Sequence, residues 1–241
     1  MDLIEADPDN PNRHPWEIAR AASMLSLVRA LPPTTQYADI GAGDLYFSGR
    51  LAKRTVHPVI AVDTAFVAPI ATGGIEAHTS LSDVPGGTID CAFLMDVLEH
   101  VDRDDVLLQR VLKILRPGGL VVITVPAHRA LWSHHDVFLG HRRRYSRRQL
   151  LHLADSCGLI VQECFYFFGM PLAWRILTQS LSRCGLNGRR GVGGWRYGPA
   201  HPFTQIASLL LKTDFAINRA FGRASLPTVG LSIGAICRSQ P

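Results

Sequence analysis

The chain has 241 residues, 47% of them hydrophobic and 19% charged, which is enough apolar material for one large core and excludes a disordered chain. No apolar run reaches the ~18 residues that a membrane-spanning helix needs, and the five cysteines are an odd number without a C-x-x-C pair. The composition argues against a membrane-spanning protein, a disulfide framework and a zinc ribbon, so we expect one domain in a reducing cytoplasm.

The charge is divided unevenly along the chain. Residues 1–105 hold 16 acidic and 7 basic residues (net −9), whereas residues 106–241 hold 4 acidic and 18 basic ones (net +14). Chance clustering of solvated side chains is one explanation. The other is that the C-terminal half faces an anionic partner, which would be a phosphate, a nucleic acid or a membrane surface.

Strands and helices alternate through the first 168 residues. Helical spacing of apolar residues predicts an N-terminal helix over 14–31, stopped by Pro32. A continuous apolar run, typical of a strand buried on both faces, lies at 58–62, and another buried strand is expected over 89–95. The other elements expected in this region are strands over 37–40, 75–78, 120–125 and 160–168, and helices over 45–53, 104–115 and 146–155. With a last strand over 229–237, this order predicts an α/β fold with a doubly wound, mostly parallel seven-stranded sheet.

Residues 169–228 interrupt that alternation before the last strand. Two apolar segments, 171–183 and 202–222, have helical spacing, and a Gly- and Arg-rich stretch joins them. We expect the whole chain to be one domain, with a cofactor-binding core over 36–168 and a helical insertion over 169–228 that caps the substrate or merely connects two elements.

The first motif that carries chemistry is Asp39-Ile-Gly41-Ala-Gly43, at a strand end before a helix. Glycines there let the backbone approach a ligand, and Asp63 ends the next strand, where an acid can accept hydrogen bonds from a ribose. The dinucleotide pattern G-x-G-x-x-G would need glycine at position 46, which is Tyr46. The motif thus indicates a nucleoside cofactor and disfavours a dehydrogenase.

An acid two residues before the first glycine resembles motif I of the class I S-adenosylmethionine-dependent methyltransferases. Three further segments match that family in order: 61–63 (A-V-D), 90–100 (D-C-A-F-L-M-D-V-L-E-H) and 115–126 (L-R-P-G-G-L-V-V-I-T-V-P). Residues 13–20 (R-H-P-W-E-I-A-R) and 132–145 (W-S-H-H-D-V-F-L-G-H-R-R-R-Y) look like a bacterial branch of the broad methyltransferase domain family. The third glycine of motif I is Leu45 here, and we expect its side chain to tighten the cofactor pocket or to shift the loop.

The resemblance implies S-adenosyl-L-methionine as cofactor, with one set of residues around it. Asp39 and Gly41 would face its methionine end, Asp63 and Thr64 its ribose, and Arg20 its carboxylate. The full implied set is Arg20, Asp39, Gly41, Gly43, Asp63, Thr64, Thr79, Ser80, Asp96, Val97 and His100.

Residues after the fifth strand of the sheet are the candidates for catalysis. A hydroxyl acceptor benefits from a general base near neutral pKa, and His135, Asp136 and His141 lie where an open α/β sheet binds ligands. The alternative is that they only hold the loop. We expect no metal site from His134, His135 and Asp136, because adjacent residues seldom converge on one ion.

Five arginines, at 142–144 and 147–148, lie beside those residues. Cationic charge at a helix N-terminus opposes the helix dipole, which favours an external anion over a solvated helix start. Trp132, Arg143, Arg144 and Tyr145 are therefore the candidate substrate-binding residues.

Together these patterns predict a methyltransferase that acts on a small-molecule or lipid-linked acceptor, anionic and methylated on oxygen. Its expected place is the cytoplasm, with a peripheral contact to the inner face of the membrane. The alternatives are a nucleic-acid methyltransferase, supported only by the basic half, and a non-catalytic binding module that retains the fold, supported only by Leu45.

Overall fold

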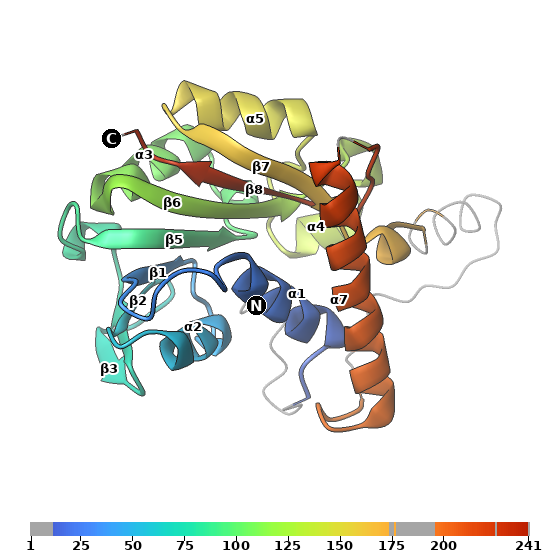
Figure 1. Cartoon of the computed structure of the whole chain (residues 1–241), viewed down its shortest axis with the longest axis horizontal. Helices are drawn as coiled ribbons and strands as arrows, with labels where there is room; N and C mark the ends of the chain where they lie inside the picture. Colours follow the sequence, from blue (N-terminus) through green and yellow to red (C-terminus); the bar gives the residue numbers. More distant parts are fainter. Residues whose placement is uncertain (1–11, 174–175, 177–195, 225, 241) are drawn as a thin grey trace.

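The computed structural model describes residues 12–173, 176, 196–224 and 226–240, and in them the chain forms one mixed sheet in the order β3-β4-β2-β1-β5-β6-β8-β7 (Figure 1). Five strands are parallel: β1 (Tyr37–Ile40), β2 (Val59–Val62), β4 (Ile75–His78), β5 (Ile89–Met95) and β6 (Leu115–Pro126). Antiparallel strands β8 (Ser232–Arg238) and β7 (Ile160–Phe167) complete one edge. The expected doubly wound, mostly parallel α/β sheet is confirmed.

Helices cover both faces of the sheet because its central strands are apolar on both sides. In β5, Ala92 and Leu94 belong to one buried cluster, whereas Cys91 and Phe93 belong to the other. The first cluster includes side chains of α3 (Asp104–Ile114) and α5 (Arg147–Ser156). The second includes side chains of α1 (Pro15–Leu27), α2 (Tyr46–Leu51) and α7 (Pro202–Arg223).

Several element boundaries differ from those expected. An eighth strand, β3 (Ile70–Thr72), pairs antiparallel with β4 across a turn in which Gly73 and Gly74 have positive φ. Its residues are all exposed, so it has no hydrophobic pattern to reveal it. Helix α1 ends at Leu27, before residue 31, and β8 begins at Ser232, after residue 229. Strand β6 begins at Leu115 and contains the Pro117-Gly118-Gly119 stretch that was expected to precede it, and the register with β5 shifts there.

The insertion is described only in part. The expected second helix is α7, which lies beside α1 and against β7, as Figure 1 shows. Of the first expected helix, over 171–183, residues 171–173 are helical and most of the rest falls outside the described residues, as does most of the Gly- and Arg-rich stretch. Among the described helices, none combines the length and the hydropathy needed to cross a bilayer.

Short elements fill the connections at the carboxyl ends of the parallel strands and beyond. These are the 3-10 turns η1 (Ala52–Arg54), η2 (Leu81–Asp83), η3 (Leu98–His100) and η4 (Arg129–Leu131), and the short helix α4 (His134–Phe138). The chain runs outward from β1 through β2 to β4 and then returns to β5 on the other side of β1. Open α/β sheets bind ligands at such a switch point, so the fold places a site at the ends of β1 and β5.

Candidate active site

The glycine loop after β1 is shaped by close contact with the connection after β5. Gly41 has φ +73°, and a Cβ built there would lie 2.5 Å from Cγ2 of Val97. No other residue could replace this glycine without displacing Val97, because the space is filled and the backbone is left-handed. The two predicted cofactor residues Gly41 and Val97 therefore meet at the switch point.

Leu45 has a left-handed backbone conformation of the kind that glycine favours. Its φ is +62°, a left-handed conformation that costs a non-glycine residue about 1–2 kcal/mol. Its side chain packs against a small cluster that contains Ala42, Ala61 and Ile75. The loop thus retains its glycine-type geometry, and the strain is offset by this packing.

Asp63, at the end of β2, holds the same loop from the other side. One of its carboxylate oxygens accepts a hydrogen bond from the backbone N–H of Gly43 at 2.8 Å, and the other accepts one from Ala65 at 2.8 Å. A carboxylate has about four acceptor positions, so capacity for further donors remains. Thr64 follows directly and is exposed. Thr79 and Ser80 follow the neighbouring strand β4, where the Ser80 hydroxyl accepts a hydrogen bond from the N–H of Ser82 at the start of η2.

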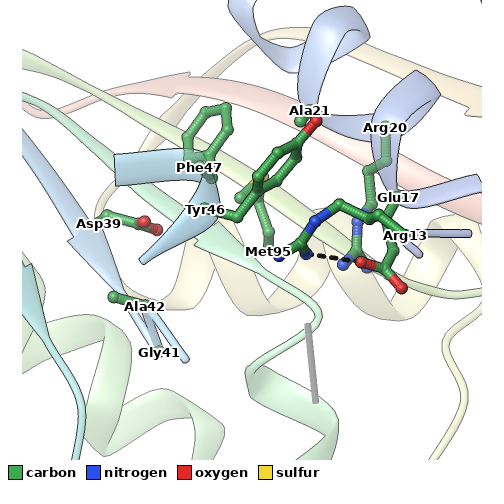
Figure 2. Close-up of a pocket in the computed structure, with 10 residues that line it drawn as sticks. All are labelled: Arg13, Glu17, Arg20, Ala21, Asp39, Gly41, Ala42, Tyr46, Phe47 and Met95. Carbon is green, nitrogen blue, oxygen red and sulfur yellow. Dashed lines mark hydrogen bonds and ion pairs between the residues drawn. The ribbon is translucent and has the colours of Figure 1, made fainter. Parts of the chain in front are cut away.

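A cavity lies between the glycine loop and α1, and Figure 2 shows the side chains that line it. From α1 and the residues before it come Arg13, Glu17 and Arg20, and from the β1 end come Asp39 and Gly41. Both carboxylates and guanidinium groups therefore line one small space. The remaining lining residues are Ala21, Ala42, Tyr46, Phe47 and Met95.

Ion pairs tie the α1 side of this cavity to the strand ends. Arg13 pairs with Asp44 and, at 2.7 Å, with Glu17, and its guanidinium lies 3.8 Å from the ring centroid of Tyr46. Arg20 pairs with Asp96, whose other oxygen accepts a hydrogen bond from Thr124 at 3.1 Å. A ligand that carries both an ammonium and a carboxylate group could pair with these acids and arginines. It would replace the ion pairs that they now form with one another.

Asp39 is the most deeply buried acid of the cavity, 1% exposed. Burial raises its pKa to about 6, although the hydrogen bond from Ser48 at 2.6 Å opposes the rise. A raised pKa means that the folded protein binds a proton which the unfolded chain has already lost, so stability falls as pH rises through this range.

We therefore expect the pH dependence of stability to change in Asp39→Asn. Between about pH 4 and pH 6 the free energy of unfolding of the wild type should fall relative to that of the variant, by up to about 3 kcal/mol. Urea denaturation at a series of pH values measures this difference. Asp83→Asn, an exposed acid in η2, is the matched control, and parallel curves for the wild type and Asp39→Asn would contradict the expectation.

The structure brings two of the three predicted catalytic residues together. Asp136, in α4, is fully buried and accepts hydrogen bonds from Nδ1 of His141 at 3.0 Å, from Nε of Arg144 at 2.7 Å and from the N–H of Ser133 at 2.9 Å. Although burial acts to raise it, these donors hold the pKa of Asp136 well below its usual range. With Nδ1 bonded to Asp136, the lone pair of His141 lies on Nε2. The backbone N–H of His135 donates to the hydroxyl of Ser133, which caps the start of α4.

The arginines of this loop bind groups of the protein itself. Arg142 pairs with Asp102, and Arg143 pairs with Asp104 and donates to the carbonyl oxygens of Val101 and Asp102. Arg147 donates to the carbonyl of Cys164. Arg142 and Arg143 are thus paired with acids 39 or more residues away in sequence, and binding of an external anion by this cluster stays a prediction.

Two of the four predicted substrate residues are also committed to internal contacts. Arg144 is 6% exposed and bonded to Asp136 and to the carbonyl of Ala127. Tyr145 is 3% exposed, and its hydroxyl lies 2.6 Å from the carboxylate of Asp104. Their burial favours a role in holding the loop, whereas Trp132, 37% exposed, remains open to a ligand.

Three residues of the site were not singled out from the sequence. Arg13 and Glu17 line the cavity, and both lie in the R-H-P-W-E segment, whose spacing was the available signal. Glu99 is fully buried beside His100, inside the D-V-L-E-H segment.

Comparison with known proteins gives a consistent answer. The model of a family described as "Methyltransferase domain" matches residues 16–163. The trans-aconitate 2-methyltransferase of Deinococcus radiodurans is 28% identical over 134 residues, which are 52% of each chain. The chain thus spans about half the length of this curated relative.

Solved structures share the fold at low sequence identity. Geranyl diphosphate methyltransferase in complex with S-adenosylmethionine superposes with a TM-score of 0.58 at 13% identity, over 98% of this chain and 93% of that one. A putative sarcosine dimethylglycine methyltransferase from Galdieria sulphuraria superposes with a TM-score of 0.56 at 16% identity, over 93% and 86%. At these identities the likeness concerns the fold alone.

Proposed function

The chain belongs to the methyltransferase domain family, and from that premise we propose that it transfers the methyl group of S-adenosylmethionine to an oxygen of a small-molecule or lipid-linked acceptor. The observation that carries the proposal is the juxtaposition at the switch point. A cavity lined by acids and arginines lies at the glycine loop after β1, and the Asp136–His141 pair follows β6, which lies on the far side of β5 from β1.

The residues present fit this cofactor. Its methionine end carries an ammonium and a carboxylate, which match Asp39 and Glu17 on one side and Arg13 and Arg20 on the other. Gly41 has no Cβ, which lets the loop and the connection after β5 approach each other closely at Val97, and Asp63 offers acceptor capacity at the strand end where a ribose would lie. When bound, S-adenosylmethionine supplies an electrophilic methyl group on a sulfonium and leaves as S-adenosylhomocysteine.

The chain's own residues then have two tasks. The first is to hold acceptor and methyl carbon in line, which alone can supply much of the rate. The second is to help remove the acceptor's proton, and we assign it to His141, because Asp136 orients its ring and leaves the Nε2 lone pair available. Asp136 also stabilises positive charge on that ring.

Two measurements test the assignment. Calorimetric titration with S-adenosylmethionine should show one site per chain, and absence of binding to the folded protein would refute the proposal. A screen with methyl-labelled cofactor against small-molecule and lipid extracts identifies the acceptor. Binding without label transfer to any fraction would favour the non-catalytic binding module.

The anionic character of the acceptor is supported by net charge rather than by the loop arginines. Residues 164–241 contain one acid, Asp214, and nine lysines and arginines. The internal pairing of Arg142–Arg144 removes the densest cluster from the argument for a nucleic-acid substrate. A lipid-linked acceptor is the better match because α7 also exposes apolar side chains.

Helix α7 exposes large apolar side chains, and its buried face combines polar residues with the core residue Phe215. Its buried positions include Thr204 and Ser208, and Ser208 donates to the carbonyl of Pro15. Asp214 turns inward and accepts hydrogen bonds from the N–H groups of Gly169 and Met170. Its exposed large apolar side chains, between 48% and 60% exposed, are Phe203, Ile206, Leu209, Leu210, Ile217 and Phe221. An apolar face in a region of net positive charge suits a helix that lies on an anionic bilayer.

We expect the chain to float with anionic vesicles but not with neutral ones, and high salt to release it. The double variant Leu210→Gln, Ile217→Gln should lower the bound fraction several-fold, because it places amides on the apolar face. Ile160→Gln, an equally exposed position at the start of β7, is the control. Flotation of the double variant equal to that of the wild type would refute the membrane contact. If the wild type is instead a dimer and the double variant a monomer, the apolar face of α7 binds a second copy of the chain.

A further inference from the structure

We infer that Glu99, His100 and His141 form a binding site for one divalent transition-metal ion beside the acceptor. The ligand atoms of these three side chains all lie within 4.8 Å of one another. Two imidazoles and one carboxylate are a ligand set used for Zn²⁺ and Fe²⁺, with positions left open for a substrate oxygen. The inference deepens the proposed function and rests on it, because that oxygen would belong to the acceptor.

The imidazole rings of His100 and His141 lie in edge-to-face contact with each other. The His100 and His141 ring centroids are 4.8 Å apart at an interplanar angle of 79°. Asp136 binds Nδ1 of His141, which leaves Nε2 for an ion and holds the ring orientation. A carboxylate on the second ring nitrogen is the usual support of a metal-binding histidine.

Glu99 supplies the negative charge. Its side chain is 0% exposed, between the end of β5 and the loop that carries His141. A carboxylate at this position beside two imidazoles completes the mixed nitrogen and oxygen ligand set of such a site.

Several hydrogen bonds connect the backbone of η3 to the loop that carries His141. The N–H of Arg142 donates to the carbonyl of Glu99 at 2.7 Å, and Nε of Arg142 donates to the carbonyl of His100 at 3.0 Å. Arg143 and Tyr145 bind the carbonyl oxygens of Val101 and Leu98 in the same turn. These contacts fasten the His141 loop onto η3, which is the rigidity that a metal site needs and a further use for the loop arginines.

The ion would explain how His141 assists loss of the acceptor's proton. An acceptor hydroxyl bound to a divalent ion has a lowered pKa, so its proton passes to solvent and the oxygen keeps the electron pair. That pair forms the new C–O bond while the C–S bond breaks toward sulfur. With the ion bound, Nε2 of His141 is a ligand, so His141 assists proton loss through the ion, and the direct role as a base assigned above applies to the metal-free protein.

Metal binding can be measured without an acceptor. We expect untagged, chelator-treated protein to bind one Zn²⁺ or Mn²⁺ per chain by calorimetry, to show a Tm raised by Zn²⁺, and to show no comparable effect of Mg²⁺, which prefers all-oxygen sites. Glu99→Gln and His100→Gln should each weaken Zn²⁺ binding at least about tenfold. His57→Gln, an exposed histidine distant in sequence, is the control and should bind like the wild type.

Equal Zn²⁺ affinity in the wild type, Glu99→Gln and His100→Gln would overturn the inference, as would the absence of one-to-one binding in the wild type. Titration with S-adenosylmethionine in chelator separates this failure from failure of the proposed function. If the cofactor binds and methyl transfer proceeds at full rate without metal, His141 acts directly as the base and only the metal site is refuted.

Discussion

Replacement of His141 by glutamine should lower the rate of methyl transfer by about 10²–10⁴-fold, while the affinity for S-adenosylmethionine stays within about twofold of the wild type. Glutamine retains polarity and approximate size but offers neither a basic nitrogen nor a titrating ring. Its effect would separate assistance to proton removal from cofactor binding, because His141 contacts Asp136 and packs on His100, whereas the cofactor cavity is lined by other residues.

Single-turnover rates with a methyl-labelled cofactor and the acceptor found by screening measure this change. His152→Gln, an exposed histidine on α5, is the matched control. His135→Gln tests the other histidine of the α4 region and should have a smaller effect, since the described contacts of the Asp136 carboxylate include His141. Near-wild-type rates for both His141→Gln and His135→Gln would leave positioning as the whole mechanism.

The second large effect is expected from Asp63→Ala, which should weaken cofactor binding by about 10- to 100-fold. Several donors lose their acceptor in this variant: the N–H groups of Gly43 and Ala65, each 2.8 Å from the Asp63 carboxylate, and the ribose hydroxyls of the bound cofactor. An unmatched buried donor costs about 1–3 kcal/mol, which corresponds to this range of affinity.

Calorimetric titration with S-adenosylmethionine measures the loss, with circular dichroism to show that the variant is folded. Asp83→Ala removes the same charge from an exposed position in η2 and should bind normally. An affinity for folded Asp63→Ala equal to that of the wild type would refute the ribose assignment. A loss equal to that of Asp83→Ala would mean that net charge, and not the strand-end acid, is responsible.

Much of the fold could be predicted because its central strands are apolar on both faces. Strand β5 occupies Ile89–Met95, as its largely apolar sequence predicts, and the capping box of Ser146 and Gln149 marks the start of α5. The exposed edge strand β3 could not be found in this way, because pairing with β4 stabilises it without burying its side chains.

The part of the site that directly follows the parallel strands could be predicted from the sequence. Gly41 and Asp63 follow parallel strands directly, so the topology alone brings them to one edge of the sheet. The partner of Asp136 could not be chosen this way, since His135 and His141 are both near it in sequence. In the structure, helix α4 buries Asp136 and directs its carboxylate toward His141, which forms the hydrogen bond.

The amino-acid sequence by itself determined the order of strands and helices, the glycine loop and the acids at the strand ends, because these depend on local hydrophobicity and backbone freedom. Only the tertiary structure decided what the charged side chains do. Arg143 binds Asp104, Arg20 binds Asp96, and His141 meets Glu99 and His100, each across 39 or more residues of chain. Such pairs arise because a charge removed from water must find an opposite charge or a hydrogen bond, and the folded sheet determines which of them lies within reach.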